Sequence, residues 1–549
     1  MRLAALTRLD RNAGRLKAIV SILAKYGLAD WLSGLDYDWL QQWLVSSDGK
    51  KLGHLSREAR IRIALTELGT TFVKLGQMLS TRSDLIGPAL AAELAQLQAN
   101  TPPDPPEVVR AVVAAELGKP PEELFLEFED RALASASIGQ VHRARLQNGQ
   151  AVVVKLQHPG IEEKVTTDLD LLEGLAALAQ EHAAQLRPYQ PVALVREFRR
   201  TILRELDFVA ERRSMQRFAA SFTEDETIRV PAVYPALCTR RVLTMDLLEG
   251  VKGSDVNALK NSGADLSAFA RRAATMYLQM IFRDGFYHAD PHPGNYMLLP
   301  GGVVGVLDCG MVGRIDDDLR EEIESLLLAV ISRDAQELTD VITRICQAPS
   351  GLDRDMLRME IGDFCSEYVS QSLQEFDFTG AINQLTEIIR RHRLVLPSSC
   401  ALLLKTLVML EGISRQLSPD FNLAELLQPY RAKIVQRRLS PSALVRKLQR
   451  AFRDWDRLLA ELPRDMSDII RRVRSGTFEV KHEHHRLEKA VNRLALGVVT
   501  AALLLAAAQL LSSSGAESFR WAFFLLGSLA LSVAAILGYR LIRAISKDD

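Results

Sequence analysis

The spacing of apolar residues divides this chain of 549 residues into stretches with different periods. Residues 1–106 have a helical period with a break near Gly53, and they end in the proline-rich segment TPPDPP, which predicts a linker or a sharp turn. Residues 125–156 contain short apolar runs with strand character, and the pair Asn148-Gly149 between two of them is a strong hairpin signal. The chain therefore begins with a helical extension and continues into an antiparallel meander.

The pattern after the meander is mainly helical. Helices are expected before residue 285 in three places, over residues 161–185, 192–218 and 266–284. A buried strand over residues 242–248 suits a hinge, and the helical period resumes after Gly310 and continues to about residue 427. The pattern predicts an α+β fold with a strand-bearing lobe over residues 107–250 and a helical lobe over residues 251–430.

Two long apolar runs lie near the end of the chain, over residues 494–511 and 521–541. Each is close to the roughly 20 residues that cross a bilayer core. The segment between them is too short to fold separately, so we expect a two-helix transmembrane hairpin over residues 494–541. Positive residues flank the outer ends, and the connecting loop offers only Arg520, offset by Glu517, so both ends should be cytoplasmic. The alternative is a pair of buried helices in a soluble core.

Charge is balanced over the whole chain, with 68 basic and 68 acidic residues, which argues against a nucleic-acid partner. Residues 431–493 are an exception, with 17 Lys or Arg against 8 Asp or Glu just before the apolar runs, and they predict basic juxtamembrane helices that contact anionic lipid. The histidines at 482, 484 and 485 do not share one helix face, which disfavours a metal site. Five scattered cysteines indicate a reducing compartment.

The segment HADPHPGN over residues 288–295 carries the clearest chemical signal in the chain. His288, Asp290 and Asn295 have the spacing of H-x-D-x-x-x-x-N, and Asp308 follows a predicted buried strand as the Asp of a D-F-G motif does in protein kinases. Asp290 would accept or orient a hydroxyl proton, while Asn295 and Asp308 would supply oxygen ligands to Mg²⁺ on nucleotide phosphates. A simple polar turn would explain the first motif, but it would not explain the second at this distance.

Upstream residues complete a predicted nucleotide site. Lys155 ends the run VVVK, as the phosphate-binding lysine of kinases ends V-A-I-K. A small-residue loop stands where kinases place glycines, and its Cβ atoms restrict positive φ, so we expect altered nucleotide handling. The residues predicted to contact nucleotide, besides Lys155, are Ala134, Ser135, Ala136, Ser137, Ile138, Met245 and Glu211.

Glu211 is the candidate to pair with Lys155, since a kinase needs one helix glutamate to hold its strand lysine. The alternative is a solvent-facing acid among neighbouring arginines. Lys74 and Gln77 lie three residues apart on one face of a predicted helix, a spacing that by itself is typical of a solvated surface.

Six segments in this order resemble the UbiB family of atypical kinase-like proteins. They are KLGQ at 74–77, LASASIGQVH at 133–142, VVVKLQHPG at 152–160, ELDF at 205–208, HADPHPGN and Asp-Cys-Gly at 308–310. The resemblance implies a bilobal protein-kinase-like fold that binds ATP or ADP with Mg²⁺, hydrolyses ATP and supports ubiquinone biosynthesis at the bacterial inner membrane, with the kinase-like part cytoplasmic. It also implies that the helix of Lys74 and Gln77 covers the active site and meets Glu205 and Asp207. Family members often have proline where Thr70 stands.

The partners that this resemblance implies are ATP, membrane lipids, quinone precursors and other proteins of ubiquinone synthesis, with a homodimer left open. Two other functions fit parts of the pattern. The first is a small-molecule or lipid phosphotransferase of the aminoglycoside or choline kinase type, since these enzymes share the pattern of Asp290, Asn295 and Asp308. The second is a nucleotide-binding scaffold that does not turn over its nucleotide. The long apolar tail argues against the former, and the presence of Lys155, Asp290, Asn295 and Asp308 together argues against the latter.

Overall fold

The chain divides into two compact units, residues 1–440 and residues 441–549. The computed structural model describes most of the first unit and three short helical stretches of the second. The described residues are 12–28, 55–97, 101–182, 189–332, 334–349, 351–368, 376–438, 498–509, 525–526 and 528–537.

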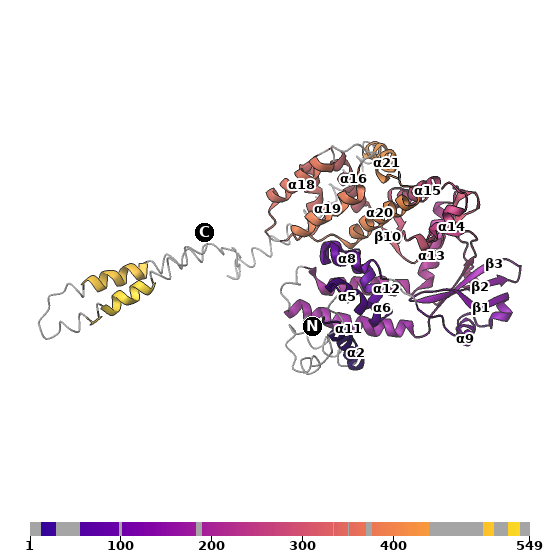
Figure 1. The fold of residues 1–549 in the computed structure, drawn as a ribbon, viewed down its shortest axis with the longest axis horizontal. Coiled ribbons are helices and arrows are strands. Elements are labelled where there is room, and N and C mark those ends of the chain that lie inside the picture. Colours follow the sequence, from indigo (N-terminus) through magenta and orange to yellow (C-terminus); the bar gives the residue numbers. More distant parts are fainter. Residues whose placement is uncertain are drawn as a thin grey trace, which may run out of the picture. The chain divides into compact units, whose positions relative to one another are not determined.

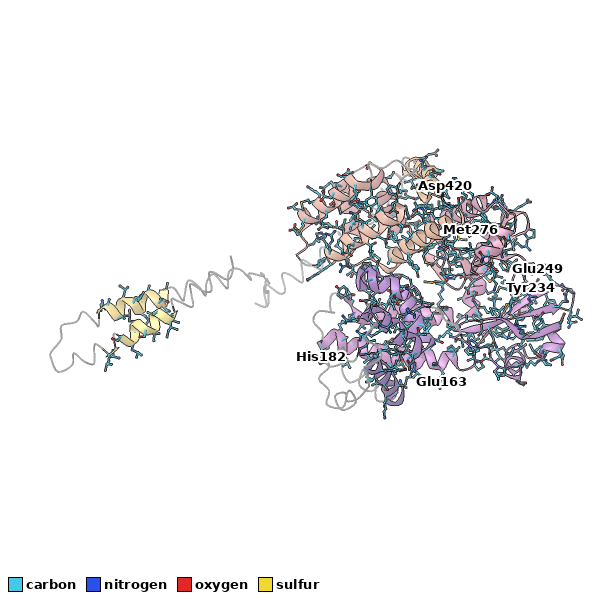
Figure 2. The ribbon with its side chains drawn as sticks, viewed as in Figure 1. Glu163, His182, Tyr234, Glu249, Met276 and Asp420 are labelled. Atoms are coloured by element: carbon cyan, nitrogen blue, oxygen red, sulfur yellow. The ribbon has the colours of Figure 1, made fainter. Side chains whose placement is uncertain are left out.

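The first unit begins with a helical extension. Its helices are α2 (Ala13–Lys25), α5 (Arg57–Leu68), α6 (Thr70–Leu79), α7 (Ser83–Ile86) and α8 (Pro88–Leu94). Ser56 caps α5 by accepting a hydrogen bond from the Ala59 amide at 3.1 Å, and Gly69 separates α5 from α6 at a φ of 98°, a conformation that suits glycine. The apolar faces of α2, α5 and α6 pack together with the long helix α11 (Ile161–His182). Figure 2 shows α11 between Glu163 near its start and His182 at its end.

A four-stranded antiparallel sheet follows, with the order β1-β2-β3-β5. The strands are β1 (Phe125–Ser135), β2 (Gly139–Leu146), β3 (Ala151–Gln157) and β5 (Val242–Asp246). The predicted hairpin joins β2 and β3, with Gly149 at a φ of 86°. One face of the sheet packs on α9 (Pro106–Leu117), which is followed by the short α10 (Pro121–Leu124), and the other face packs on α13 (Phe208–Ser221). Figure 1 shows this sheet beside the extension helices.

Two expectations about local structure are wrong in detail. Strand β1 runs through Ala134 and Ser135, which pair with Val141 and Gln140, so the small-residue loop is shorter than predicted and spans only residues 136–138. The helix expected over residues 192–218 is two helices, α12 (Pro191–Glu205) and α13, because Asp207 leaves the helical conformation and caps α13. Apolar periodicity continues across the break, so the sequence pattern did not reveal it.

The rest of the unit is mostly helical and holds two small sheets. The sheet β4-β9-β8-β6 contains β4 (Ile228–Arg229), β6 (Val251–Lys252), β8 (Tyr296–Leu299) and β9 (Val303–Val306), and β7 (Phe286–His288) pairs with β10 (Val312–Arg314). A π-turn, Met280–Asp284, ends α15 (Leu266–Gln279), and Gly285 at a φ of 60° directs the chain into β7. The other helices are α14 (Val256–Asn261), α16 (Asp317–Ser332), α17 (Ala335–Ile345), α18 (Arg354–Tyr368), α19 (Phe378–Arg391), α20 (Ser398–Leu417) and α21 (Leu423–Arg438).

The second unit is described only at residues 498–509, 525–526 and 528–537, which are helical. Among the residues that the structure describes, no helix is long and apolar enough to span a bilayer. The predicted transmembrane hairpin is therefore not supported by the described segments, and its remaining residues lie outside them. Residues 431–438 of the predicted basic segment belong to α21, and residues 439–493, including the three histidines, lie outside the described residues.

Candidate active site

The centre of the candidate site is an ion-pair network around Lys155. Lys155 lies in the middle of β3, between β2 and β5, and its Nζ is 2.9 Å from both carboxylate oxygens of Glu211 on α13. Asp308 Oδ2 lies 3.2 Å from the same nitrogen, and the ring of Phe208 lies below it. The structure thus brings Lys155 into contact with Glu211, 56 positions later in the chain, and with Asp308, 153 positions later.

These three groups set one another's protonation. Burial opposes the charge of Lys155, but the carboxylates of Asp308 and Glu211 raise its pKa well above the ordinary value. Burial also opposes ionisation of Asp308, yet Lys155 and the Gly310 amide hold the pKa of that carboxyl well below its usual range. Glu211 is only 3% exposed, and burial raises its pKa to about 7 despite the Lys155 ammonium. Asp308 is therefore the dominant anion of the network.

The segment after β7 carries the second group of residues. Asn295 ends the 3₁₀ turn Pro293–Asn295, and its Nδ2 donates to the Asp290 backbone carbonyl at 3.1 Å and to Asp290 Oδ2 at 2.9 Å. The Asp290 amide donates to Nδ1 of the His288 ring, whose Nε2 in turn donates to the backbone carbonyl of Asp308. The buried ring of His288 therefore links the backbone at Asp290 to the backbone at Asp308.

The oxygen atoms of this region suit Mg²⁺. The Asp308 carboxylate is 47% exposed, and the Asn295 amide nitrogen is used by Asp290, so the Asn295 carbonyl oxygen is the atom left for a cation. Within the described residues, no three His, Cys, Asp or Glu side chains form a metal-binding group. One carboxylate, one amide oxygen and phosphate oxygens form the kind of hard donor set that Mg²⁺ takes in nucleotide sites. The predicted donors thus fit the ion by their chemistry.

The predicted nucleotide-contacting residues of the smaller lobe are more buried than expected. Met245 is 7% exposed and packs in the largest apolar core cluster. The side chain of Ile138 is also 7% exposed and packs with α11 and α12. Ala134, Ser135, Ala136 and Ser137 form the end of β1 and the start of the loop. A role for Ile138 in binding nucleotide would have to come from its backbone.

The extension contacts the site through one residue of the predicted pair. Lys74 on α6 forms an ion pair with Glu205 at the end of α12. Burial opposes its charge, but Glu205, with the fields of Asp308 and Asp290, raises the pKa of Lys74 above its ordinary value. Gln77 donates to the Leu97 carbonyl at 3.0 Å, and Asp207 accepts from the Val209 amide at 3.0 Å as the cap of α13. The expected meeting of Gln77 with Glu205 or Asp207 is therefore absent among the described contacts, because Gln77 bonds to the Leu97 backbone and Asp207 to the Val209 backbone.

Sequence reasoning missed Lys405. It lies on α20, beside Thr406, whose hydroxyl contacts the Ala289 carbonyl at 3.4 Å. Burial lowers the pKa of Lys405; the Asp290 carboxylate opposes this effect and the Lys74 ammonium adds to it. The segment CALLLKTLVML places one lysine in an otherwise apolar helix, and that signal could have identified it.

Comparisons with known proteins agree with the motifs. Three family models match the chain: the ABC1 atypical kinase-like domain at residues 96–342, the UbiB helical domain at residues 361–422 and the ABC1/UbiB kinase-like C-terminal domain at residues 479–547. The first of these covers the Lys155 network, the Asp290 loop and Asp308.

Two curated relatives span nearly the same length. The "Probable protein kinase UbiB" of Aeromonas salmonicida is 33% identical over 472 residues, which are 84% of this chain and 86% of that protein. The protein of the same name from Aeromonas hydrophila is 32% identical over 536 residues, 95% of this chain and 96% of that protein. A solved structure described as the complex of Rv3197 with erythromycin from Mycobacterium tuberculosis is 24% identical, with a TM-score of 0.45, and covers 66% of this chain and 93% of that one.

Proposed function

Because the chain belongs to the ABC1/UbiB family of atypical kinase-like proteins, we propose that it binds ATP or ADP with Mg²⁺ and hydrolyses ATP. The observation that carries this proposal is the convergence of Lys155, Glu211 and Asp308, with the His288 ring linking Asp308 to the Asp290 loop. Phosphoryl transfer depends mainly on positioning and on stabilising charge, and this arrangement provides groups for both.

Each residue has a distinct role in this proposal. Lys155 neutralises phosphate charge, and Glu211 keeps its ammonium in place. Asp308 and Asn295 hold the cation, which when bound would draw negative charge from the phosphates. Asp290 orients the attacking water or hydroxyl through Oδ1, which has no hydrogen-bond partner within the described residues, while Asn295 holds Oδ2.

We further propose that the protein acts at the bacterial inner membrane, with its kinase-like part in the cytoplasm, in support of ubiquinone biosynthesis. The apolar runs at residues 494–511 and 521–541 support a membrane anchor. So does the exposure of apolar side chains in the described parts of the second unit, where Leu505 is 69%, Leu529 63% and Ile536 60% exposed. Membrane lipids and phenolic quinone precursors are the partners this location would offer.

The test measures phosphate release from ATP by the purified full-length protein, with and without anionic liposomes and a phenolic quinone precursor. We expect Mg²⁺-dependent release that rises with liposomes and is lost in Asp290→Asn. If the precursor becomes phosphorylated, the function is small-molecule phosphotransfer and not ATP hydrolysis. Nucleotide binding without any turnover, under all of these conditions, would leave only the scaffold role.

A further inference from the structure

The three carbonyl groups of the small-residue loop are all held by donors from elsewhere in the unit. The Ala136 carbonyl lies 2.9 Å from Nε2 of His158, and the Ile138 carbonyl accepts from the His158 amide at 2.9 Å. The carbonyl of Ser137, between them, accepts from the Thr70 hydroxyl at 3.2 Å. His158 follows β3, and Thr70 is the first residue of α6, so two distant segments fix this loop.

In a trans peptide the N–H points opposite to the C=O. A hydrogen bond that holds the carbonyl of one residue therefore also fixes the direction of the amide of the following residue. The contact of His158 with the Ala136 carbonyl thus orients the Ser137 N–H, and the hydrogen bond from Thr70 to the Ser137 carbonyl orients the Ile138 N–H. Within the described residues, neither of these amides donates a hydrogen bond, although Ser137 is 4% and Ile138 7% exposed. Unpaired amides in residues that are largely buried are unusual, and an anion would complement them.

A third donor, at the end of β1 next to the loop, also has no hydrogen-bond partner among the described residues. The Oγ of Ser135 is buried and has no hydrogen-bond partner in the part of the chain that the structure describes. Within the described residues, the loop therefore combines three satisfied acceptors with two amides that have no hydrogen-bond partner, those of Ser137 and Ile138, and the unpaired hydroxyl of Ser135 precedes it. Phosphate oxygens accept hydrogen bonds and carry negative charge, so they complement such a set.

The tie through His158 depends on the proline-rich segment that the sequence marks only as a linker. Nδ1 of His158 lies 2.7 Å from Asp104 Oδ2, and the buried side chain of Gln140 accepts from the Asp104 amide at 2.9 Å. Asp104 Oδ2 and the Ala136 carbonyl lie against the two ring nitrogens of His158, so together they hold the ring in one orientation. Asp104 thereby fixes the ring that holds Ala136.

We propose that His158, held by Asp104, and Thr70 are positioning residues that orient the Ser137 and Ile138 amides toward a nucleotide phosphate. This inference rests on the proposed nucleotide-binding function. In a glycine-rich loop, the free backbone lets the amides turn toward the phosphates. Here, side chains outside the loop would orient the amides instead. The inference also links the small-residue loop to the helical extension, since Thr70 and Lys74 lie one turn apart on α6.

The test measures the affinities of ADP and of adenosine at constant Mg²⁺, using full-length variants. Thr70→Val removes the hydroxyl donor at nearly constant volume, and Thr70→Ser retains it. His158→Leu removes the ring donors, and the double variant Asp104→Asn with His158→Gln restores a donor to Ala136 without charge. Thr66→Val is a matched control, because the Thr66 hydroxyl bonds only to Arg62 of its own helix.

We expect Thr70→Val and His158→Leu each to weaken ADP binding about tenfold, equivalent to about 1.4 kcal/mol. Adenosine affinity should stay nearly constant in both, because it has no phosphate. Thr70→Ser, the double variant and Thr66→Val should keep ADP affinity near that of the unmodified protein. Equal losses for ADP and adenosine, unchanged ADP affinity in Thr70→Val and His158→Leu, or no recovery in the double variant would overturn the inference. An unmodified protein that binds neither ligand would overturn the proposed function itself.

Discussion

The Lys155 network and the Asp290 loop face the same proposed ligand but are built differently. Lys155 has two carboxylates within 3.2 Å, so the network is neutralised by its own members before any ligand binds. The side chain of Asp290 is hydrogen-bonded to a neutral amide, that of Asn295. The ammonium groups of Lys74 and Lys405 interact with Asp290 by longer-range electrostatics, without a direct contact in the described part of the chain. The first region is arranged to keep its geometry, and the second leaves a carboxylate oxygen for chemistry.

This difference predicts that substitutions in the two regions affect binding and turnover separately. Changes at Asp308 should affect both, because its carboxylate belongs to the Lys155 network and is joined through the His288 ring to the Asp290 backbone. Changes at Asp290 and Lys405 should affect turnover, and a change at Glu211 should also change the pH dependence of stability.

The largest effect is expected for Asp308→Asn. This change removes the anion that pairs with Lys155 and supplies the proposed cation ligand, so Mg²⁺-nucleotide binding should be abolished. Calorimetric titration with Mg²⁺ and ADP measures it. Asp290→Asn is the matched control and should still bind. Unchanged binding in Asp308→Asn would remove the metal assignment.

Asp290→Asn should leave nucleotide affinity nearly unchanged and lower phosphate release by about 10²- to 10⁴-fold, the usual contribution of a positioned acid or base. The amide keeps the shape of the side chain but cannot accept a proton. Steady-state phosphate release and equilibrium nucleotide binding, measured on the same preparation, separate the two effects. A parallel loss of affinity would mean that Asp290 belongs with the binding network instead.

Lys405→Gln should lower turnover by about tenfold, because it removes a positive charge near the Asp290 carboxylate, the proposed site of the reaction. Nucleotide affinity should change little, since Lys155 is retained. Lys260→Gln on α14 is a suitable control, because Lys260 is an exposed lysine. The same steady-state assay compares the two variants, and equal turnover in both would exclude a catalytic part for Lys405.

The smallest effect is expected for Glu211→Gln, as a change in pH dependence. The pKa of Glu211 is raised from its ordinary 4.5 to about 7, so the folded protein binds this proton more tightly than the unfolded chain. The resulting stabilisation is fully present below pH 4.5 and is lost as the pH rises through about 7. Glutamine does not titrate, so the variant should gain Tm relative to the unmodified protein across this interval. Thermal unfolding at several pH values measures this, and a relative loss of Tm would show that Lys155 holds Glu211 ionised.

The sequence by itself determined the local chemistry. The spacing of Asp290 and Asn295 brings both into one short loop, and the Asn148-Gly149 pair forms the predicted turn between β2 and β3. It also identified Lys155 as the strand lysine and Glu211 as the helix acid to pair with it, and the two side chains are in contact, although Lys155 lies inside β3 and not at its end. Such features depend on residues close together in the chain or on a motif order that predicts the fold.

Only the tertiary structure decided which distant groups meet. The sequence could not show that Gln77 and Asp207 would bond to nearby backbone groups, or that Met245 and Ile138 would be buried. Nor could it place Lys405 near Asp290, or bring Asp104 from a linker to the ring of His158, 54 positions away. Residue spacing fixes neighbours along a helix or a strand, whereas these contacts arise when separate elements bury their apolar faces against one another and bring their polar groups along.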